Sequence, residues 1–241
     1  MIKILDYVLD IFFPKKCIIC SKTLEAGADL CLCDNCIKDP FLKFHNPTFP
    51  YEKFFDEIYF CLPYIDNIKV SLLNLKFNNQ YILSKTFGYL SARRLENEDT
   101  DNIDIVAAVP ISSKRRKDRG YNQSELIAKS MCDITGLIYD DTVIQKIKEL
   151  PPVSSMNKEE RMKAVKGAYS VQKSVKGKNI LLVDDIYTTG STVNECARLF
   201  KKNGAESVKV MCVLCGVRSD EKKIYRETME ENSQKGFLNL F

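Results

Sequence analysis

The sequence has no apolar run long enough to cross a membrane and no recognisable export leader. Its first ten residues are apolar but include two acids, and they lack a basic start and a small-residue cleavage site. No stretch approaches the roughly 18 uninterrupted apolar residues of a membrane span. We therefore expect a protein of the reducing cytoplasm, where clustered cysteines hold a metal more often than they form disulfides.

A further absence concerns the enzymes that hydrolyse nucleoside triphosphates. No Gly-x-x-x-x-Gly-Lys-Ser/Thr loop occurs in the 241 residues, so nothing supports that class. The net charge of +4 is small, and it permits contact with phosphates without marking a nucleic-acid binder. Internal repeats and low-complexity tracts are also missing. The length suits one α/β domain with a small appendage.

Hydrophobic patterning divides the chain into three parts. Residues 1–50 combine an amphipathic helix over 1–13 with a cysteine-rich, turn-rich segment, and residues 219–241 form a charged tail. Between them, residues 51–218 alternate strands and helices, which predicts a parallel sheet flanked by helices. The expected strands are 57–63, 104–109, 141–148, 180–183 and 207–214; the expected helices are 68–75, 81–95, 123–135 and 191–203; and the expected loops are 111–120 and 149–163.

The segment from Ile180 to Thr192 carries the strongest chemical signal. An apolar strand runs into Asp184 and Asp185, which are followed by a turn and then a helix. Turn amides and hydroxyls at a helix N-terminus suit a phosphate, and a glycine lets the backbone approach it closely. Carboxylates repel phosphate, so their partners are hydroxyl groups or a divalent cation. A phosphorylated sugar satisfies both halves. The predicted phosphate-binding residues are Thr188, Thr189, Gly190, Ser191 and Thr192.

The residues after Pro110 are predicted to form an exposed basic loop. Five cations close together cannot be buried without partners. Three interpretations stay open: a solvated loop, a diphosphate site, or a contact with a nucleic-acid backbone. Tyr121 is a candidate to stack on a base beside these cations. The candidate residues for diphosphate or DNA are Ser112, Lys114, Arg115, Arg116, Lys117 and Arg119.

Two Cys-x-x-Cys pairs, Cys17 with Cys20 and Cys33 with Cys36, lie twelve residues apart. Pairs at this separation can meet in a tetrahedral four-thiolate zinc site, which is structural because no coordination position stays open. Cys31 offers another register, but the two-residue spacing suits the knuckle better. Reduced thiols and a redox pair are the alternatives. We predict one structural zinc ion held by the four cysteines.

The run from Val183 to Thr192 resembles the phosphoribosyl-diphosphate (PRPP) fingerprint of type I phosphoribosyltransferases. This resemblance implies that Asp184 and Asp185 hold the ribose hydroxyls and that the following turn holds the 5-phosphate. It also implies that magnesium arrives on the diphosphate. The fingerprint specifies a ligand rather than a reaction, so the catalytic residues stay open, with Asp184 and Asp185 as candidates.

The order of motifs resembles the ComF family from about Pro14 to Leu214. The motifs are the four-cysteine knuckle, Val109-Pro110, Arg119-Gly120-Tyr121-Asn122-Gln123, Arg161, Gly167-Ala168-Tyr169 and the PRPP loop. The resemblance implies a type I phosphoribosyltransferase fold with a small zinc-ribbon-like knuckle. It also implies a cytoplasmic competence factor that binds PRPP, supports uptake of single-stranded DNA during natural transformation and works beside a competence helicase. The alternative is a phosphoribosyltransferase of nucleobase salvage or nucleotide synthesis, which the knuckle disfavours.

Overall fold

A computed structural model describes residues 2–38, 52–96, 98, 100, 102–150 and 158–216 of the chain. The charged tail at 219–241 and the Pro151-Pro152 turn lie outside these ranges. No helix within them is both long and apolar enough to pass through a lipid bilayer.

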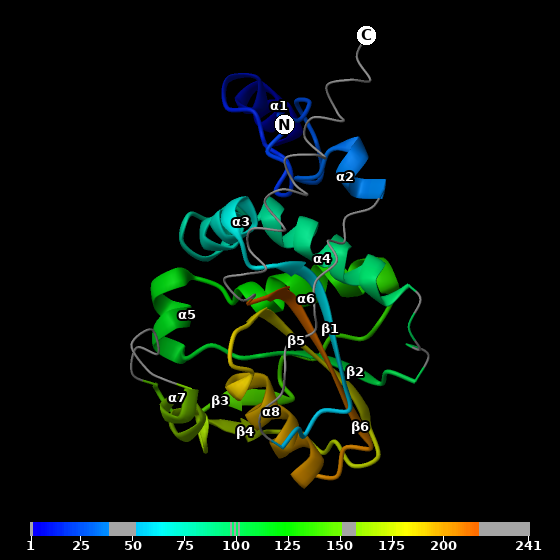
Figure 1. The fold of residues 1–241 in the computed structure, drawn as a ribbon, viewed down its shortest axis with the longest axis vertical. Coiled ribbons are helices and arrows are strands. Elements are labelled where there is room, and N and C mark those ends of the chain that lie inside the picture. The colour runs from blue at the N-terminus through cyan, green and yellow to red at the C-terminus, as the bar shows by residue number, and fades with distance from the viewer. Residues whose placement is uncertain are drawn as a thin grey trace.

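A four-stranded parallel sheet forms the centre of the structure (Figure 1). Its strands lie in the order β1 (Glu57–Pro63), β6 (Ser207–Cys215), β5 (Asn179–Tyr187) and β2 (Ile105–Ala108). Strands buried on both faces are apolar almost throughout, as these are, because each side chain meets a packed layer. All four strands point the same way, so their carboxyl ends share one edge, where open α/β sheets bind ligands.

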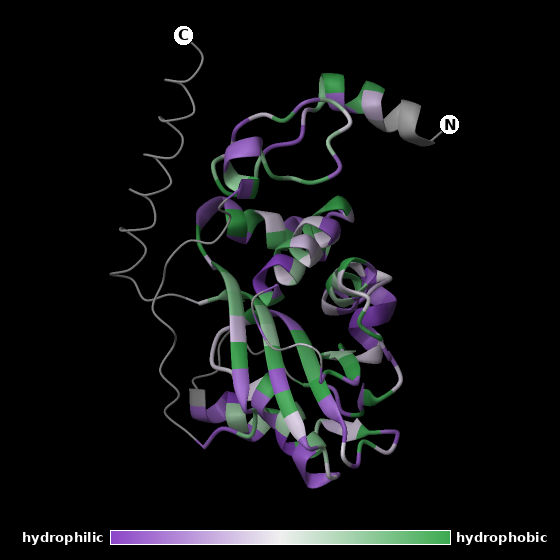
Figure 2. Cartoon of the chain, turned by 90° about the vertical axis from the view of Figure 1, so that its right-hand side faces the viewer, coloured by the Kyte–Doolittle hydropathy of each residue, from purple (hydrophilic) through white to green (hydrophobic). Residues whose placement is uncertain are grey.

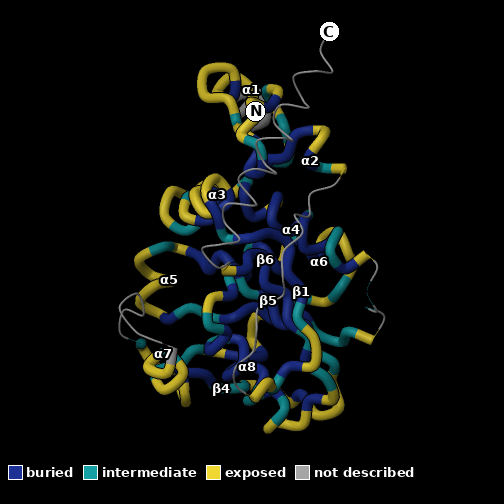
Figure 3. The backbone as a smooth tube through the Cα atoms, viewed as in Figure 1, coloured by how far each residue is buried: buried dark blue, intermediate teal, exposed yellow. Residues whose placement is uncertain are grey.

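Helices cover both faces of this sheet. Helices α4 (Ile82–Leu95) and α6 (Gln123–Thr135) pack on one face, and α8 (Ser191–Lys202) packs on the other. Successive side chains of β5 point to opposite faces of the sheet. Leu181 packs in the core under α4 and α6, and Leu182 packs in the core under α8. The buried strands between exposed helix surfaces are visible in Figure 3, and the apolar strands in Figure 2. The predicted α/β class is confirmed.

The N-terminal segment lies against the α4 side of the sheet. It contains α1 (Ile2–Phe12), a cysteine knuckle and α2 (Asp34–Lys38), and α3 (Asp66–Phe77) follows the first strand. Residues of the knuckle belong to the same apolar core as helix α4 and the sheet. The backbone N–H of Cys31 donates to the Thr86 hydroxyl at 2.9 Å, which ties the knuckle to α4. The knuckle is therefore packed on the larger domain.

Several expectations about local structure were wrong. The basic residues after Pro110 form a short helix, α5 (Ser113–Arg119), capped at its start by the Ser112 hydroxyl. Part of the expected polar loop at 149–163 is helix α7 (Lys158–Val165). The expected strand at 141–148 contains β3 (Ile144–Lys146), which pairs with an unexpected strand, β4 (Tyr169–Val171), as a separate antiparallel ribbon. Propensity missed α5, α7 and β4 because their stability comes from tertiary contacts.

Gly88 sets how closely α4 and α6 approach. A Cβ atom at this position would lie 2.6 Å from the Ser130 Cβ and 2.9 Å from the Met131 backbone nitrogen. An alanine inside a helix normally stabilises it by up to about 1 kcal/mol over glycine. Here we expect the reverse, a loss of about 1–3 kcal/mol from overpacking, measured for Gly88→Ala by urea unfolding. The double change Gly88→Ala with Ser130→Gly should recover part of the loss; greater stability for the single variant would contradict the packing argument.

Candidate functional site

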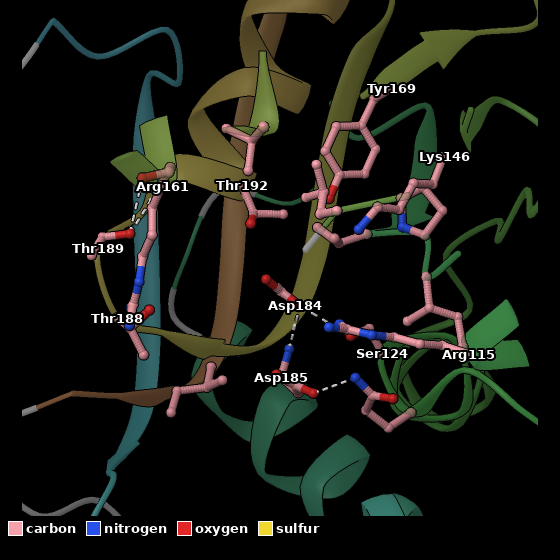
Figure 4. Close-up of a pocket in the computed structure, with 18 of the residues that line it drawn as sticks. Arg115, Ser124, Lys146, Arg161, Tyr169, Asp184, Asp185, Thr188, Thr189 and Thr192 are labelled. Atoms are coloured by element: carbon pink, nitrogen blue, oxygen red, sulfur yellow. Dashed lines mark hydrogen bonds between the residues drawn. The ribbon is translucent and has the colours of Figure 1, made fainter. Parts of the chain in front are cut away.

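A pocket of about 190 Å³ opens where β2 and β5 end (Figure 4). Its floor is the end of β5 with the turn into α8, and its walls come from the ends of β2, α3 and α6. The side chains of α5, β3 and α7 complete the rim. The polar and charged lining residues are Lys76, Arg115, Gln123, Ser124, Lys146, Arg161, Tyr169, Asp184, Asp185, Thr188, Thr189, Ser191 and Thr192.

Strand β5 continues to Tyr187 rather than ending at Val183, so Asp184 lies within the strand. Its side chain lines the pocket. One oxygen of its carboxylate accepts hydrogen bonds from the Ser124 hydroxyl at 3.1 Å and the Asp185 backbone N–H at 2.9 Å. Loss of hydration, followed by repulsion from Asp185, raises the pKa of Asp184 to about 7. A ligand hydroxyl group or cation beside this carboxylate would therefore stabilise its charged form.

Asp185 is held quite differently. Its side chain is almost fully buried, and an unpaired buried carboxylate would be costly. The Lys76 ammonium lies 2.8 Å from its Oδ2 atom, and the Gln123 side-chain amide donates to the same oxygen at 2.5 Å. Helix α3 supplies the lysine and helix α6 the amide. Side chains from both helices thus hold the Asp185 carboxylate in place, and its Oδ2 atom is already occupied by them.

The turn after β5 prepares an anion site. Gly190 adopts a left-handed conformation with φ of 72°, which a side chain would make costly, and it is the N-cap residue of α8. The Thr189 and Ser191 hydroxyls lie 2.9 Å apart and share a hydrogen bond. Backbone N–H groups in the first turn of a helix have no acceptor within the helix and favour an anion. These hydroxyls and amides suit a phosphate group.

Cationic side chains border the opposite wall. Lys146 lies with its ammonium 5.4 Å from the centre of the Tyr169 ring, and burial, with Arg115 nearby, lowers the pKa of this lysine. Arg115 approaches the same wall from α5, whereas Arg161, from α7, lies on the other side of the pocket beside Thr188 and Thr189 (Figure 4). Carboxylates on the floor and cations on the rim match a ligand with hydroxyl groups at one end and several negative charges at the other.

Most of the predicted basic set lies elsewhere. Of its members, only Arg115 lines the pocket. Arg116 pairs with Glu125, and Arg119 donates to the Gln123 side chain. The buried Ser112 caps α5, while Lys114 and Lys117 are exposed on its surface. Tyr121, the expected stacking residue, is buried, and its hydroxyl donates to the Leu75 carbonyl.

Sequence reasoning missed six polar or charged lining residues: Lys76, Gln123, Ser124, Lys146, Arg161 and Tyr169. Four of them had a partial signal, because Gln123, Ser124, Arg161 and Tyr169 lie in or beside motifs shared with the ComF family. Lys76 and Lys146 had none, since each is an ordinary polar residue at the end of its element. Only the folded chain brings them to the carboxylates.

The four knuckle cysteines meet in space. The Sγ atoms of Cys17, Cys20, Cys33 and Cys36 all lie within 4.8 Å of one another, and Cys20 and Cys33 are 3.6 Å apart. Tetrahedral zinc thiolates, with Zn–S bonds of about 2.3 Å, place sulfur atoms about 3.8 Å apart. Hydrogen bonds from the Cys20 and Cys36 thiols lower the pKa of Cys17. The cluster can hold a metal ion. Cys31 is buried outside it.

Comparison with known proteins agrees with this geometry. Residues 90–238 match the phosphoribosyl transferase domain family. "Competence protein F" of Haemophilus influenzae is 25% identical over 185 residues, which cover 74% of this chain and 76% of that protein. "Competence protein ComFC" of Streptococcus pneumoniae is 30% identical over 139 residues, covering 58% of this chain and 59% of that one.

A further relative is "DNA utilization protein YhgH" of Salmonella typhi. It is 34% identical over 110 residues, which are 46% of this chain and 48% of that protein. The chain thus aligns with about half the length of these DNA utilization proteins.

The raised pKa of Asp184 makes a testable statement about stability. Between pH 4 and 7 the unfolded chain ionises this carboxyl while the folded chain holds its proton, so folding becomes progressively less favourable. Asp184→Asn removes that cost and keeps an oxygen for Ser124. We expect the variant to be more stable at pH 8 by about 1–3 kcal/mol, seen as a higher Tm, with little difference at pH 4.

The matched control is Asp141→Asn, which removes a carboxylate that is exposed at the surface. Its Tm difference from the parent should stay small at both pH values. An Asp184→Asn variant that is less stable than the parent at pH 8 would show that the carboxylate is already well neutralised.

Proposed function

Because the chain belongs to the phosphoribosyl transferase domain family, and within it to the ComF family, we propose that it binds PRPP and acts as a competence factor. In this role it supports the uptake of single-stranded DNA into the cytoplasm during natural transformation. The names of the H. influenzae and S. pneumoniae relatives support the competence role, and the family match supports the ligand. A competence helicase as partner rests on the resemblance alone.

The observation that carries the PRPP assignment is the order of groups along the pocket floor. Asp184 and Asp185 close strand β5, and the Thr188–Thr192 turn opens α8 directly after them. PRPP carries two ribose hydroxyls, a 5-phosphate and a diphosphate. The carboxylates suit the hydroxyls, the turn suits the 5-phosphate, and Arg115 and Lys146 supply cations in the same pocket for the diphosphate.

Magnesium fits this assignment as a companion of the ligand. The ion would neutralise the diphosphate, and the carboxylates of the pocket are the oxygen donors that it prefers. If transfer occurs, positive charge develops at the ribose C1 as the diphosphate leaves, and Asp184 stands on the pocket floor with a carboxylate able to stabilise that charge.

Zinc is the metal that we propose for the cysteine cluster. Four thiolates with tetrahedral spacing favour zinc and leave no position for a substrate. Because the knuckle shares the apolar core of α4 and the sheet, the metal supports the position of the whole N-terminal segment.

Calorimetry with PRPP and magnesium tests the ligand assignment. We expect Asp184→Asn together with Asp185→Asn to abolish measurable binding, because both hydroxyl acceptors lose their charge. Asp133→Asn, an exposed carboxylate on α6, is the control and should bind as the parent does. Parent-like affinity in the double variant would refute the site. Diphosphate release against a panel of bases would favour a salvage enzyme over a competence factor.

Metal analysis tests the zinc site. We expect about one zinc ion per chain and its loss in Cys33→Ser, with partial unfolding of the N-terminal segment. Cys31→Ser is the matched control, because this buried cysteine lies within the knuckle but outside the cluster. Full zinc content in Cys33→Ser, or loss of zinc in Cys31→Ser, would overturn the ligand assignment.

A further inference from the structure

Two aromatic side chains stand exposed where α3 passes into α4. Phe77, the last residue of α3, is 66% exposed, and Tyr81, just before α4, is 51% exposed. Only Asn78, Asn79 and Gln80 separate them. Large exposed rings cost free energy in water, so neighbouring exposed aromatics indicate a surface with a partner.

Helix α5 and its following turn hold both rings. The Arg119 guanidinium lies 5.0 Å from the centre of the Phe77 ring, within range of a cation–π contact. Two residues later, Tyr121 meets Tyr81 edge to face, with ring centres 5.0 Å apart. Tyr121 is itself anchored through its hydroxyl to Leu75. Side-chain contacts therefore link the end of α3 to the end of α5 and the turn after it, and these contacts hold the two rings in place.

The charge around these rings is mostly positive. Residues 67–95, which span most of α3 and all of α4, contain five lysines and arginines and no acidic residue, although Lys76, Arg93 and Arg94 pair with Asp185, Glu96 and Glu98. On the neighbouring α5, Lys114 and Lys117 are exposed beside one acid, Asp118. A surface that combines flat apolar rings with exposed cations is complementary to a polyanion that has flat apolar faces of its own.

We propose that Phe77, Tyr81 and Arg119 form a platform on which unpaired bases of a single-stranded nucleic acid stack. Each ring offers a face to a base, Arg119 adds a guanidinium plane, and the α5 lysines meet the phosphates. The inference rests on the proposed DNA function and adds a binding site to it. A duplex is disfavoured as the ligand, because its bases are already stacked on each other.

A contact network joins the platform to the pocket. Lys76, next to Phe77 in the chain, pairs with Asp185. Arg119, above the Phe77 ring, donates to Gln123, which in turn donates to Asp185. Two routes thus connect the stacking surface with one carboxylate of the proposed PRPP site. A strand lying on the platform would pass the mouth of that pocket.

Fluorescence anisotropy of a labelled oligo-dT strand tests the platform on the full-length, zinc-loaded protein. Stacking contributes about 1–3 kcal/mol per base, so we expect Phe77→Ala and Tyr81→Ala each to weaken binding about tenfold. Phe77→Trp keeps a ring and should retain the affinity. The control, Phe13→Ala, removes another highly exposed ring, directly after α1, and should change nothing.

Salt dependence separates stacking from charge. The slope of log affinity against log salt should stay unchanged in Phe77→Ala and should fall by about 0.7 for each of Lys114→Gln and Lys117→Gln. A 2-aminopurine base in the strand should be quenched by the parent and by Phe77→Trp but not by Phe77→Ala. Unchanged Tm values for the variants would show that folding is intact.

Each outcome decides between the proposals. If the parent binds oligo-dT and the alanine variants bind equally well, the platform is refuted and the proposed function stands. If the parent does not bind the strand, the DNA function fails and the platform fails with it, whatever calorimetry shows for PRPP. If Phe77→Ala instead abolishes binding to phosphatidylserine vesicles and leaves oligo-dT binding intact, the surface is a membrane contact and the proposal is overturned.

Discussion

Two adjacent carboxylates at the end of a buried strand repel each other, and the groups around the pocket offset that repulsion unequally. The Asp185 carboxylate pairs with Lys76 of α3 and accepts a hydrogen bond from the Gln123 amide of α6. The Asp184 carboxylate accepts hydrogen bonds from the neutral Ser124 hydroxyl and the Asp185 backbone N–H, and its pKa is raised. The charge of Asp185 is therefore balanced within the protein, whereas that of Asp184 has no cationic side chain bonded to it among the described residues. Neighbouring residues that look equivalent in the sequence thus have different roles in the site.

The ion pair between Lys76 and Asp185 also connects the N-terminal part of the chain to the site. Helix α3 begins beside the cysteine knuckle, where the Asn67 amide donates to the Ser21 hydroxyl, and it ends with Lys76 at Asp185. The knuckle also shares an apolar core with α4 and the sheet. A metal ion held by the four cysteines would thereby support the helix that supplies this lysine.

Much of the architecture could be predicted from local pattern. Apolar strands between amphipathic helices indicated the parallel sheet, and strand 57–63 and helix 123–135 were placed within a residue. The basic segment was expected to be a loop, yet it is a helix, because its capping Ser112 and its contacts with Phe77 and Gln123 outweigh the repulsion among its charges. Charge density alone does not decide the conformation of a segment that has tertiary partners.

The sequence by itself determined the features that are contiguous: two Cys-x-x-Cys pairs, and a strand, two acids, a hydroxyl-rich turn and a helix in succession. Their chemistry depends on spacing along the chain, which can be read directly. The tertiary structure decided everything that depends on distant elements, namely the pairing of Lys76 with Asp185, the burial of Tyr121 and the exposure of Phe77 and Tyr81. These follow from how α3, α5 and α6 pack, and no local pattern encodes which side chain of a helix faces another element.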